Sequence, residues 1–396
     1  MIRFIVKIKL ITYVILHFLW RWFKRPLLLL KHLNIAKQLI LTAGMNGFID
    51  DIFRRYLPKK YLLKTKICIK LPSSSIYSKL KTVSLTNAEL STFKNVYQID
   101  QKVNILVIRS GAMGDVILAT PIIHMLHRKY DGFCCINVAT RYPEVFRNNP
   151  YVTKILTIQE IRSLEHQFNL IIDLDCCYEK NRKKHITEAY SFNIFGAGVD
   201  VEHMQPELFP NDDDRTITKA FIEKIGGPYI VCHNRFDHTQ PYRNLATRDW
   251  EDLILRMMSQ TSFKVVQIGS KDMDFALKAH NGNLIDARGI LNLQQSQILI
   301  SNAQLFLGVD AGPLHIAATT STPIVCFFTI AHHNVRKPLR SKDTVFKAIS
   351  PNIECYGCQD QFKFGIEWYC RKVNFPCISS FNMENAFQNC LSAIQQ

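Results

Sequence analysis

The spacing of apolar residues predicts alternating strands and helices from residue 104 onward. A β-branched run, Ile105–Ile108, ends in a glycine-containing turn, and apolar positions at helical spacing follow from Val116 to Leu126. Further apolar runs are separated by polar or helix-compatible segments: Cys134–Val138, Lys154–Ile158 and Leu170–Leu174. This alternation predicts a first parallel sheet covered by helices.

A second alternation follows the acidic, proline-containing segment 206–214. The predicted strands are Tyr229–His233, Phe263–Ile268, Leu305–Gly308 and Ile324–Phe328. The predicted helices are Asp249–Ser259, Lys271–His280, Leu293–Asn302 and Leu314–Thr320. Two successive β/α series of similar size predict an α/β fold with two Rossmann-like lobes facing a cleft. We assign residues 101–215 to an N-terminal lobe and 216–396 to a C-terminal lobe.

Positive charge is concentrated ahead of these lobes, in a basic, helical extension and connector predicted over residues 1–100. The 396-residue chain has a formal net charge of +16, and residues 1–60 contain twelve Lys and Arg but only two acids. The apolar stretch Leu10–Trp20 is shorter than the roughly 20 residues that span a bilayer, and Trp20 and Trp22 stand where a signal peptide needs small residues. We therefore expect a helix lying on an anionic membrane surface, or one packed on the lobes.

The high charge favours anionic partners, which include nucleic acid, phosphorylated small molecules and acidic lipid. No RNA-binding aromatic motif or recognition-helix signature stands out in the sequence. We therefore expect no nucleic-acid partner.

A glycine-containing loop follows the first predicted strand, where parallel sheets bind their ligands. In Arg109–Asp115, Gly111 and Gly114 allow a tight turn and the approach of a ligand, while Asp115 lies at a helix start. An aspartate at this position also fits the simpler role of a helix N-cap.

A second loop of this kind, Gly308–His315, pairs Asp310 with another helix start. The free backbone N–H groups of such a helix can receive a diphosphate, and Pro313 suits the first helical turn. Taken alone, His315 is equally compatible with a packed residue on the helix face.

Together the two loops resemble the ADP-heptose glycosyltransferase family, the heptosyltransferases of lipopolysaccharide core assembly. The family pattern R-x-G-A-x-G-D-x-x-x-x-x-P matches Arg109–Pro121, and D-x-G-P-x-H-x-A-A matches Asp310–Ala318. The resemblance covers the chain from about Val103 onward. It implies a GT-B fold, inversion at the anomeric carbon and no metal required for catalysis. It also implies an ADP-sugar donor, a lipid-linked glycan acceptor and a cytoplasmic enzyme peripheral to the inner membrane.

The resemblance also assigns roles to residues. Asp115 would be the general base that takes the proton of the acceptor hydroxyl, with Gly111 and Gly114 in the acceptor-side loop. The donor-binding residues would be Arg243, Gly269, Ser270, Asp310, Gly312, Pro313, Leu314 and His315. Near Arg243 the family's common Trp-Pro is replaced by Leu245 and Ala246, and Thr329 stands where the family usually has glycine, which leaves the transferred sugar open.

Two further patterns contain residue types that bind metals. Asp173 and Asp175 form a D-x-D sequence, but it ends a strand of the first lobe, so we expect no catalytic metal there. The C-terminal cysteines have a spacing compatible with a structural zinc or iron site, a disulfide or free thiols: Cys355, Cys358, Cys370 and Cys377.

The sequence therefore predicts an inverting glycosyltransferase that moves heptose from ADP-heptose to the lipopolysaccharide inner core. One alternative keeps the fold but transfers heptose or another sugar to a protein or a different glycan. The alternative from another class is a non-catalytic protein that binds sugar nucleotides or nucleic acid.

Overall fold

The computed structural model describes residues 102–395 except positions 131, 165–166, 176, 181, 196–203, 236–240, 272–276, 278–281, 342, 362–369, 371 and 373–374. The predicted basic extension, residues 1–100, lies outside the described residues, as does most of the predicted helix Lys271–His280. Among the described residues, no helix is both long enough and apolar enough to cross a membrane.

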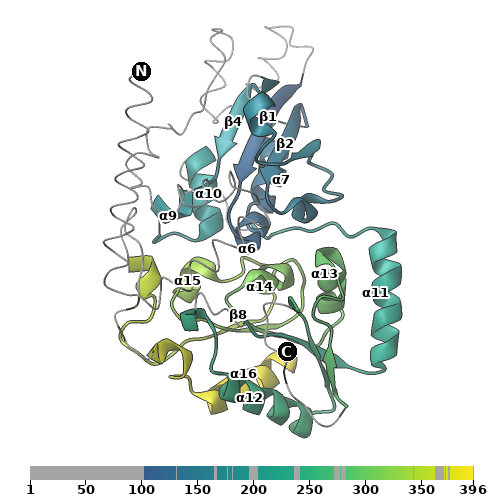
Figure 1. The fold of residues 1–396 in the computed structure, drawn as a ribbon, viewed down its shortest axis with the longest axis vertical. Helices are drawn as coiled ribbons and strands as arrows, with labels where there is room; N and C mark the ends of the chain where they lie inside the picture. The colour runs from purple at the N-terminus through teal and green to yellow at the C-terminus, as the bar shows by residue number, and fades with distance from the viewer. Residues whose placement is uncertain are drawn as a thin grey trace, which may run out of the picture. The chain divides into compact units, whose positions relative to one another are not determined.

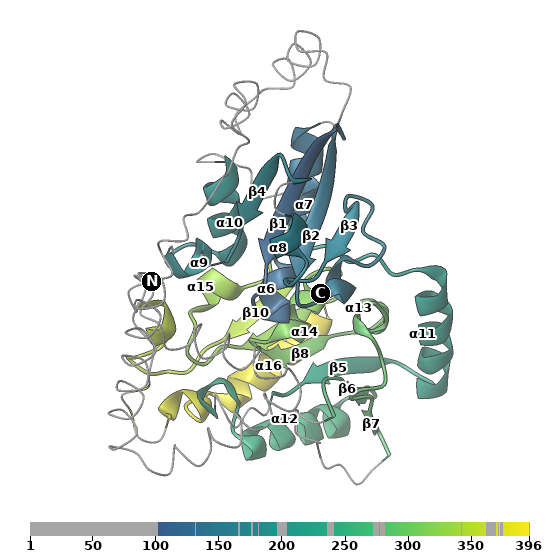
Figure 2. The same cartoon turned by 45° about the horizontal axis from the view of Figure 1, so that its top comes forward.

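The first sheet contains four parallel strands in the order β3-β2-β1-β4 (Figures 1 and 2). Their bounds are β1 Val103–Arg109, β2 Cys134–Thr140, β3 Lys154–Leu156 and β4 Leu170–Asp173. Val and Ile dominate β1 because a parallel sheet is buried on both faces. Ile108 pairs with Asp173, so the loops that follow β1 and β4 lie side by side at one edge.

Short helices surround this sheet: α6 Met113–Ile117, α7 Thr120–Lys129, η2 Pro143–Phe146, α8 Ile161–Leu164, α9 Cys177–Lys180 and α10 Ile186–Phe195. The apolar spacing after Asp115 predicted one helix, but the structure has two, α6 and α7. Pro121 lies in the first turn of α7, where its missing N–H costs nothing, and it cannot continue a helix from α6.

The second sheet contains six parallel strands in the order β10-β9-β8-β5-β6-β7. Their bounds are β5 Tyr229–His233, β6 Lys264–Gln267, β7 Leu284–Asp286, β8 Phe306–Val309, β9 Ile324–Phe327 and β10 Phe346–Ile349. The four predicted strands are confirmed. The two edge strands, β7 and β10, were not predicted because they are short and mostly half-buried, which leaves little apolar pattern.

Helices cover both faces of this sheet: α11 Asp212–Ile225, η5 Pro241–Arg243, α12 Thr247–Gln260, α13 Leu293–Ser301, α14 Gly312–Ala317, α15 His333–Arg336, η6 Cys358–Gln361, η7 Pro376–Ile378 and α16 Met383–Ile394. On one face α12 and α16 bury Trp250 and Phe387 against the strands. On the other face α13 and α14 share one apolar core with the first sheet (Figures 1 and 2). The α/β fold with two Rossmann-like lobes is confirmed.

The helix that connects the sheets, α11, is fastened to both lobes at its N-terminus. Asn211 and Asp214 form a capping box there. Asp214 also accepts hydrogen bonds from Arg147 at 2.7 Å and from Asn292 at 3.0 Å, and these donors belong to different lobes. Burial raises the pKa of Asp214, but these donors and the helix cap outweigh it and hold the pKa below its ordinary value. The ionised carboxylate therefore links the lobes.

Candidate active site

The first loop is organised by Arg109, at the carboxyl end of β1. Arg109 is 3% exposed. Its guanidinium donates to Asp115 Oδ2 at 2.9 Å and to Asp175 Oδ1 at 3.1 Å. Burial lowers the pKa of Arg109, but neighbouring negative charges outweigh burial and raise the pKa above its ordinary value. Arg109 is therefore charged and holds Asp115 in place.

Asp115 is not the N-cap of its helix, because Ala112 occupies that position. Asp115 lies in the first turn of α6, with its side chain 22% exposed and directed to Arg109. The carboxylate is therefore accessible and fixed by one strong partner, as a general base requires.

The D-x-D pair, Asp173 and Asp175, contacts the same loop after β1. Asp175 accepts a hydrogen bond from the backbone N–H of Ser110 at 2.9 Å and another from the Ser110 hydroxyl. The backbone N–H of Asp175 donates to Asp173 Oδ1 at 2.8 Å. Burial and the neighbouring Asp175 raise the pKa of Asp173 to about 6. These contacts give the pair a role in shaping the loop after β1.

The second loop brings together Arg243 and Asp310, two of the predicted donor-binding residues. Arg243, on η5, donates to the backbone oxygen of Asp310 at 2.8 Å and to its Oδ2 at 3.3 Å. Burial raises the pKa of Asp310, but the charges of Arg336 and Arg243 outweigh it and leave the pKa below its ordinary value. Asp310 is therefore an ionised carboxylate, 6% exposed, between two arginines.

Arg336 is a site residue that the sequence analysis missed. It ends α15, and its guanidinium lies 5.1 Å from the ring centroid of Tyr178, in the other lobe. Burial lowers the pKa of Arg336, but nearby groups including Asp310 and Asp115 raise it above its ordinary value. Arg336 follows β9 in the sequence, at the sheet edge that also carries Asp310, and this position is the signal that could have identified it. No sequence motif includes Arg336.

The two loops meet where α6 packs on α14 (Figures 1 and 2). A Cβ atom added to Gly114 would lie 2.6 Å from Cδ2 of His315, and one added to Gly312 would lie 2.5 Å from Cε of Met113. The sequence analysis explained these glycines by ligand approach and a tight turn. The structure adds a different reason, because both allow helix starts from the two lobes to touch.

His315 belongs to this junction. It is 3% exposed, and burial lowers its pKa to about 4 despite the opposing charges of Asp310 and Asp115. The imidazole is therefore neutral at pH 7. Three buried polar atoms here have no hydrogen-bond partner among the described residues: Asp310 Oδ1, His315 Nδ1 and Arg336 Nε. They are available to a bound ligand.

The other predicted donor residues lie around this junction or further along the sheet edge. Pro313 and the fully buried Leu314 form the first turn of α14. Gly269 and Ser270 follow β6, which is two strands away from β8, and the positive φ of Gly269 suits only glycine without strain. They lie at the same edge of the sheet as Asp310, two strands away from it.

The four C-terminal cysteines form no disulfide within the described part of the chain. Burial raises the pKa of Cys377 to about 12, with further contributions from Cys370, Cys358 and Cys355, so these three cysteines lie near Cys377. Within the described residues, no group of three His, Cys, Asp or Glu side chains is arranged to hold a metal ion.

The cysteine-containing loop also contacts the first lobe. Asp360, two residues after Cys358, accepts a hydrogen bond from the Tyr178 hydroxyl at 2.5 Å and one from the His332 backbone at 2.7 Å. Because Tyr178 also lies against Arg336, this loop borders the candidate site.

Comparison with known proteins supports an enzyme of this architecture. A glycosyltransferase family 9 protein from Veillonella parvula shares the fold with a TM-score of 0.60 at 14% identity, over 74% of this chain and 98% of the other. The iron-containing dodecameric glycosyltransferase TibC from enterotoxigenic E. coli gives a TM-score of 0.55 at 17% identity, over 74% and 76%. TibC in complex with ADP-D-β-D-heptose gives 0.52 at 15% identity, over 74% and 76%. The search of curated proteins gave no significant match.

The chain therefore has the GT-B fold of these glycosyltransferases. The sequence model of glycosyltransferase family 9 (heptosyltransferase) matches residues 161–364, and the chain belongs to this family.

The glycine contacts predict unequal effects of two matched substitutions. Gly114→Ala should lower the free energy of unfolding by about 1–3 kcal/mol, because the new methyl meets a buried imidazole that has little room to move. Gly312→Ala should cost less than about 1 kcal/mol, because the flexible end of Met113 can rotate away. Urea unfolding of both variants measures the difference. Equal losses would show that the α6–α14 contact does not constrain Gly114.

Proposed function

We propose that this glycosyltransferase moves heptose from ADP-heptose to a hydroxyl of the lipopolysaccharide inner core, with inversion at the anomeric carbon. The observation that carries the proposal is the junction of the two loops, where Asp115 from one lobe meets Asp310, His315 and Arg336 from the other. One reactive carboxylate therefore lies near the cations Arg336 and Arg243, as displacement of a nucleotide diphosphate requires.

In this mechanism Asp115 takes the proton of the acceptor hydroxyl while the hydroxyl oxygen attacks the anomeric carbon. The bond from that carbon to the diphosphate breaks, and the nucleotide leaves with the bonding electrons. Arg109 donates to Asp115 Oδ2, which leaves Oδ1 to receive the proton. Arg109 is a positioning residue, because it acts on the reaction through Asp115.

The diphosphate gains negative charge as it leaves, so cations already in place stabilise the transition state. Arg243 and Arg336 fit this role, and Asp310 holds Arg243 near its own carboxylate. Neutral His315 adds a hydrogen-bonding group without adding charge. The three polar atoms that have no partner among the described residues match a ligand at this point.

The donor and acceptor are inferred from different sources. Membership of family 9 and the ADP-heptose complex of TibC support an ADP-heptose donor. The lipid-linked acceptor follows from the motif resemblance and from the basic residues 1–60, which would attach the enzyme to the anionic inner face of a membrane. A protein or a different glycan remains the alternative acceptor, and an assay with both classes separates them.

Asp115→Asn should lower turnover by roughly 100-fold or more, because an amide of the same shape cannot take the hydroxyl proton. Binding of ADP should be unchanged, since Asp115 acts on the acceptor. ADP release measures turnover, and calorimetry measures nucleotide binding. Turnover near that of the unmodified enzyme would exclude Asp115 as the base.

Arg336→Gln should weaken ADP binding about tenfold or more, because a hydrogen bond to a charged group contributes roughly 1.5–3 kcal/mol. Arg248→Gln is the matched control: it removes the same charge from a side chain that is 91% exposed on α12. Calorimetry with ADP compares the two. If both variants bind ADP equally well, Arg336 is not a diphosphate ligand.

We further propose that Cys355, Cys358, Cys370 and Cys377 bind one structural zinc or iron ion. The proximity of the other three cysteines to Cys377 supports the proposal, as does the iron content named for TibC. Since no such group of ligands is already arranged among the described residues, the loop would have to rearrange around the metal.

Elemental analysis of protein purified without oxygen should find about one zinc or iron per chain, since four thiolates make one complete site. Cys358→Ser should lose the metal, while Cys390→Ser, at a buried free thiol on α16, should retain it. Metal-free protein, or equal metal content in both variants, would contradict the site.

A further inference from the structure

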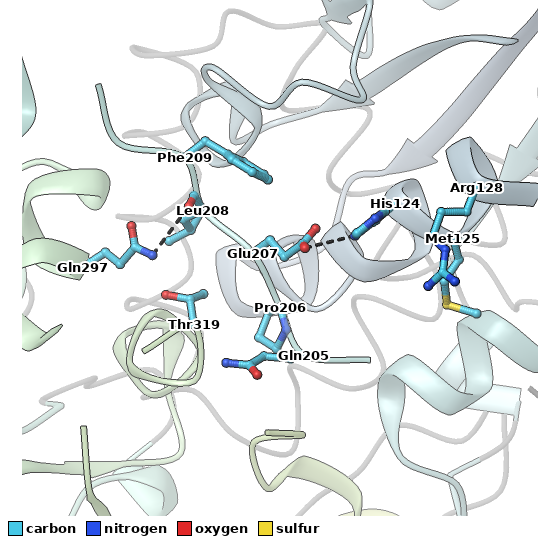
Figure 3. A pocket seen from close by; sticks show the side chains of 10 residues that line it. All are labelled: His124, Met125, Arg128, Gln205, Pro206, Glu207, Leu208, Phe209, Gln297 and Thr319. Carbon is cyan, nitrogen blue, oxygen red and sulfur yellow. Dashed lines mark hydrogen bonds and ion pairs between the residues drawn. The ribbon is translucent and has the colours of Figure 1, made fainter. Parts of the chain in front are cut away.

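A second binding site is indicated by a cavity of about 400 Å³ beside the segment that connects the lobes (Figure 3). Its walls come from α7, from the connecting segment, from α13 and from the end of α14. Its lining includes His124, Arg128, Glu207, Phe209, Gln297 and Thr319. Thr319 follows the C-terminal end of α14, whereas Asp310 precedes its start, so the cavity is distinct from the candidate active site.

Two buried acceptors in this cavity have no donor among the described residues. Glu207 uses Oε1 to contact Nδ1 of His124 at 3.0 Å, and its Oε2 has no partner. Gln297 donates weakly to the Leu208 backbone at 3.5 Å, and its Oε1 has no partner. Since buried acceptors are normally paired, these two fit a ligand that presents O–H or N–H groups.

The cavity also presents a guanidinium and an aromatic ring. Arg128 makes no ion pair within the described part of the chain and lines the same cavity. The Phe209 ring is held edge-on by Tyr151 at 6.0 Å, and Tyr151 is itself stacked on His124 at 4.2 Å. The Phe209 ring is therefore held in position by Tyr151, which is itself held by His124.

The charges of the lining select among ligand classes. A nucleotide diphosphate would place its negative charges beside the Glu207 carboxylate, with Arg128 as the permanent cation of the wall. An apolar ligand would leave the two free acceptors unpaired. A neutral polyhydroxyl ring fits better, because its hydroxyls both donate and accept while its C–H face packs on an aromatic ring.

We propose that this cavity binds a neutral saccharide unit at a site separate from catalysis. Its volume lies within the usual range of roughly 300–1,000 Å³ for ligand pockets, which often occur between domains. The site contacts both lobes and the segment between them, so a bound saccharide would hold the lobes in this arrangement. This inference does not depend on the identity of the donor or the acceptor.

Saturation-transfer NMR on the full-length protein tests the proposal, with mannose, glucose, galactose and maltose as probes. Saturating ADP is present throughout to occupy the nucleotide site. At least one saccharide should bind, and Gln297→Met should weaken that binding at least fivefold, because methionine keeps the length of the side chain but removes its hydrogen-bonding groups. Phe209→Leu should weaken it similarly by removing the ring.

Gln388→Met, the same change on the exposed surface of α16, should leave saccharide binding intact. Retained ADP binding shows that each variant is folded. The proposal is overturned if none of the four saccharides binds in the presence of ADP, or if both cavity variants bind as well as the control. Asp115→Asn should bind the saccharide normally, so a failed active-site proposal and a failed cavity proposal give different results.

Discussion

The contact between α6 and α14 is the constraint on which the site depends. Gly114 lacks the Cβ atom that would strike His315, so the first turns of two helices from different lobes touch. Asp115 lies within the first turn of α6 and Asp310 precedes the first turn of α14, so the contact places both aspartates near the same imidazole. Neither lobe alone assembles this set of groups.

Charge balance explains why acids and arginines are buried together here. An isolated buried carboxylate is costly, and it is normally paired. Asp310 has Arg243 and Arg336, while Asp115 and Asp175 share Arg109. Arg336 and Arg243 hold the pKa of Asp310 below its ordinary value, and the carboxylates hold the guanidinium groups in position. Ligand binding would then require little rearrangement of the charges.

The sequence predicted the elements with strong local signals. Central strands such as β5 and β8 are continuous apolar runs, and the two glycine loops carry family motifs. Arg336 was not predicted as a site residue because it is identified by its contact with Tyr178, which lies 158 positions earlier in the sequence. No local sequence pattern encodes a contact over that distance. The split between α6 and α7 was missed because the apolar spacing continues through the break at Pro121.

The central claim is that both loops act on one bound nucleotide sugar. A crystal structure of the Asp115→Asn variant with ADP-heptose tests it directly, because the intact donor is retained. We expect the diphosphate against Arg243 and Arg336, with the anomeric carbon facing the side chain at position 115 and room for an acceptor hydroxyl between them. A donor bound with its diphosphate away from both arginines, or with its sugar directed away from position 115, would contradict the account.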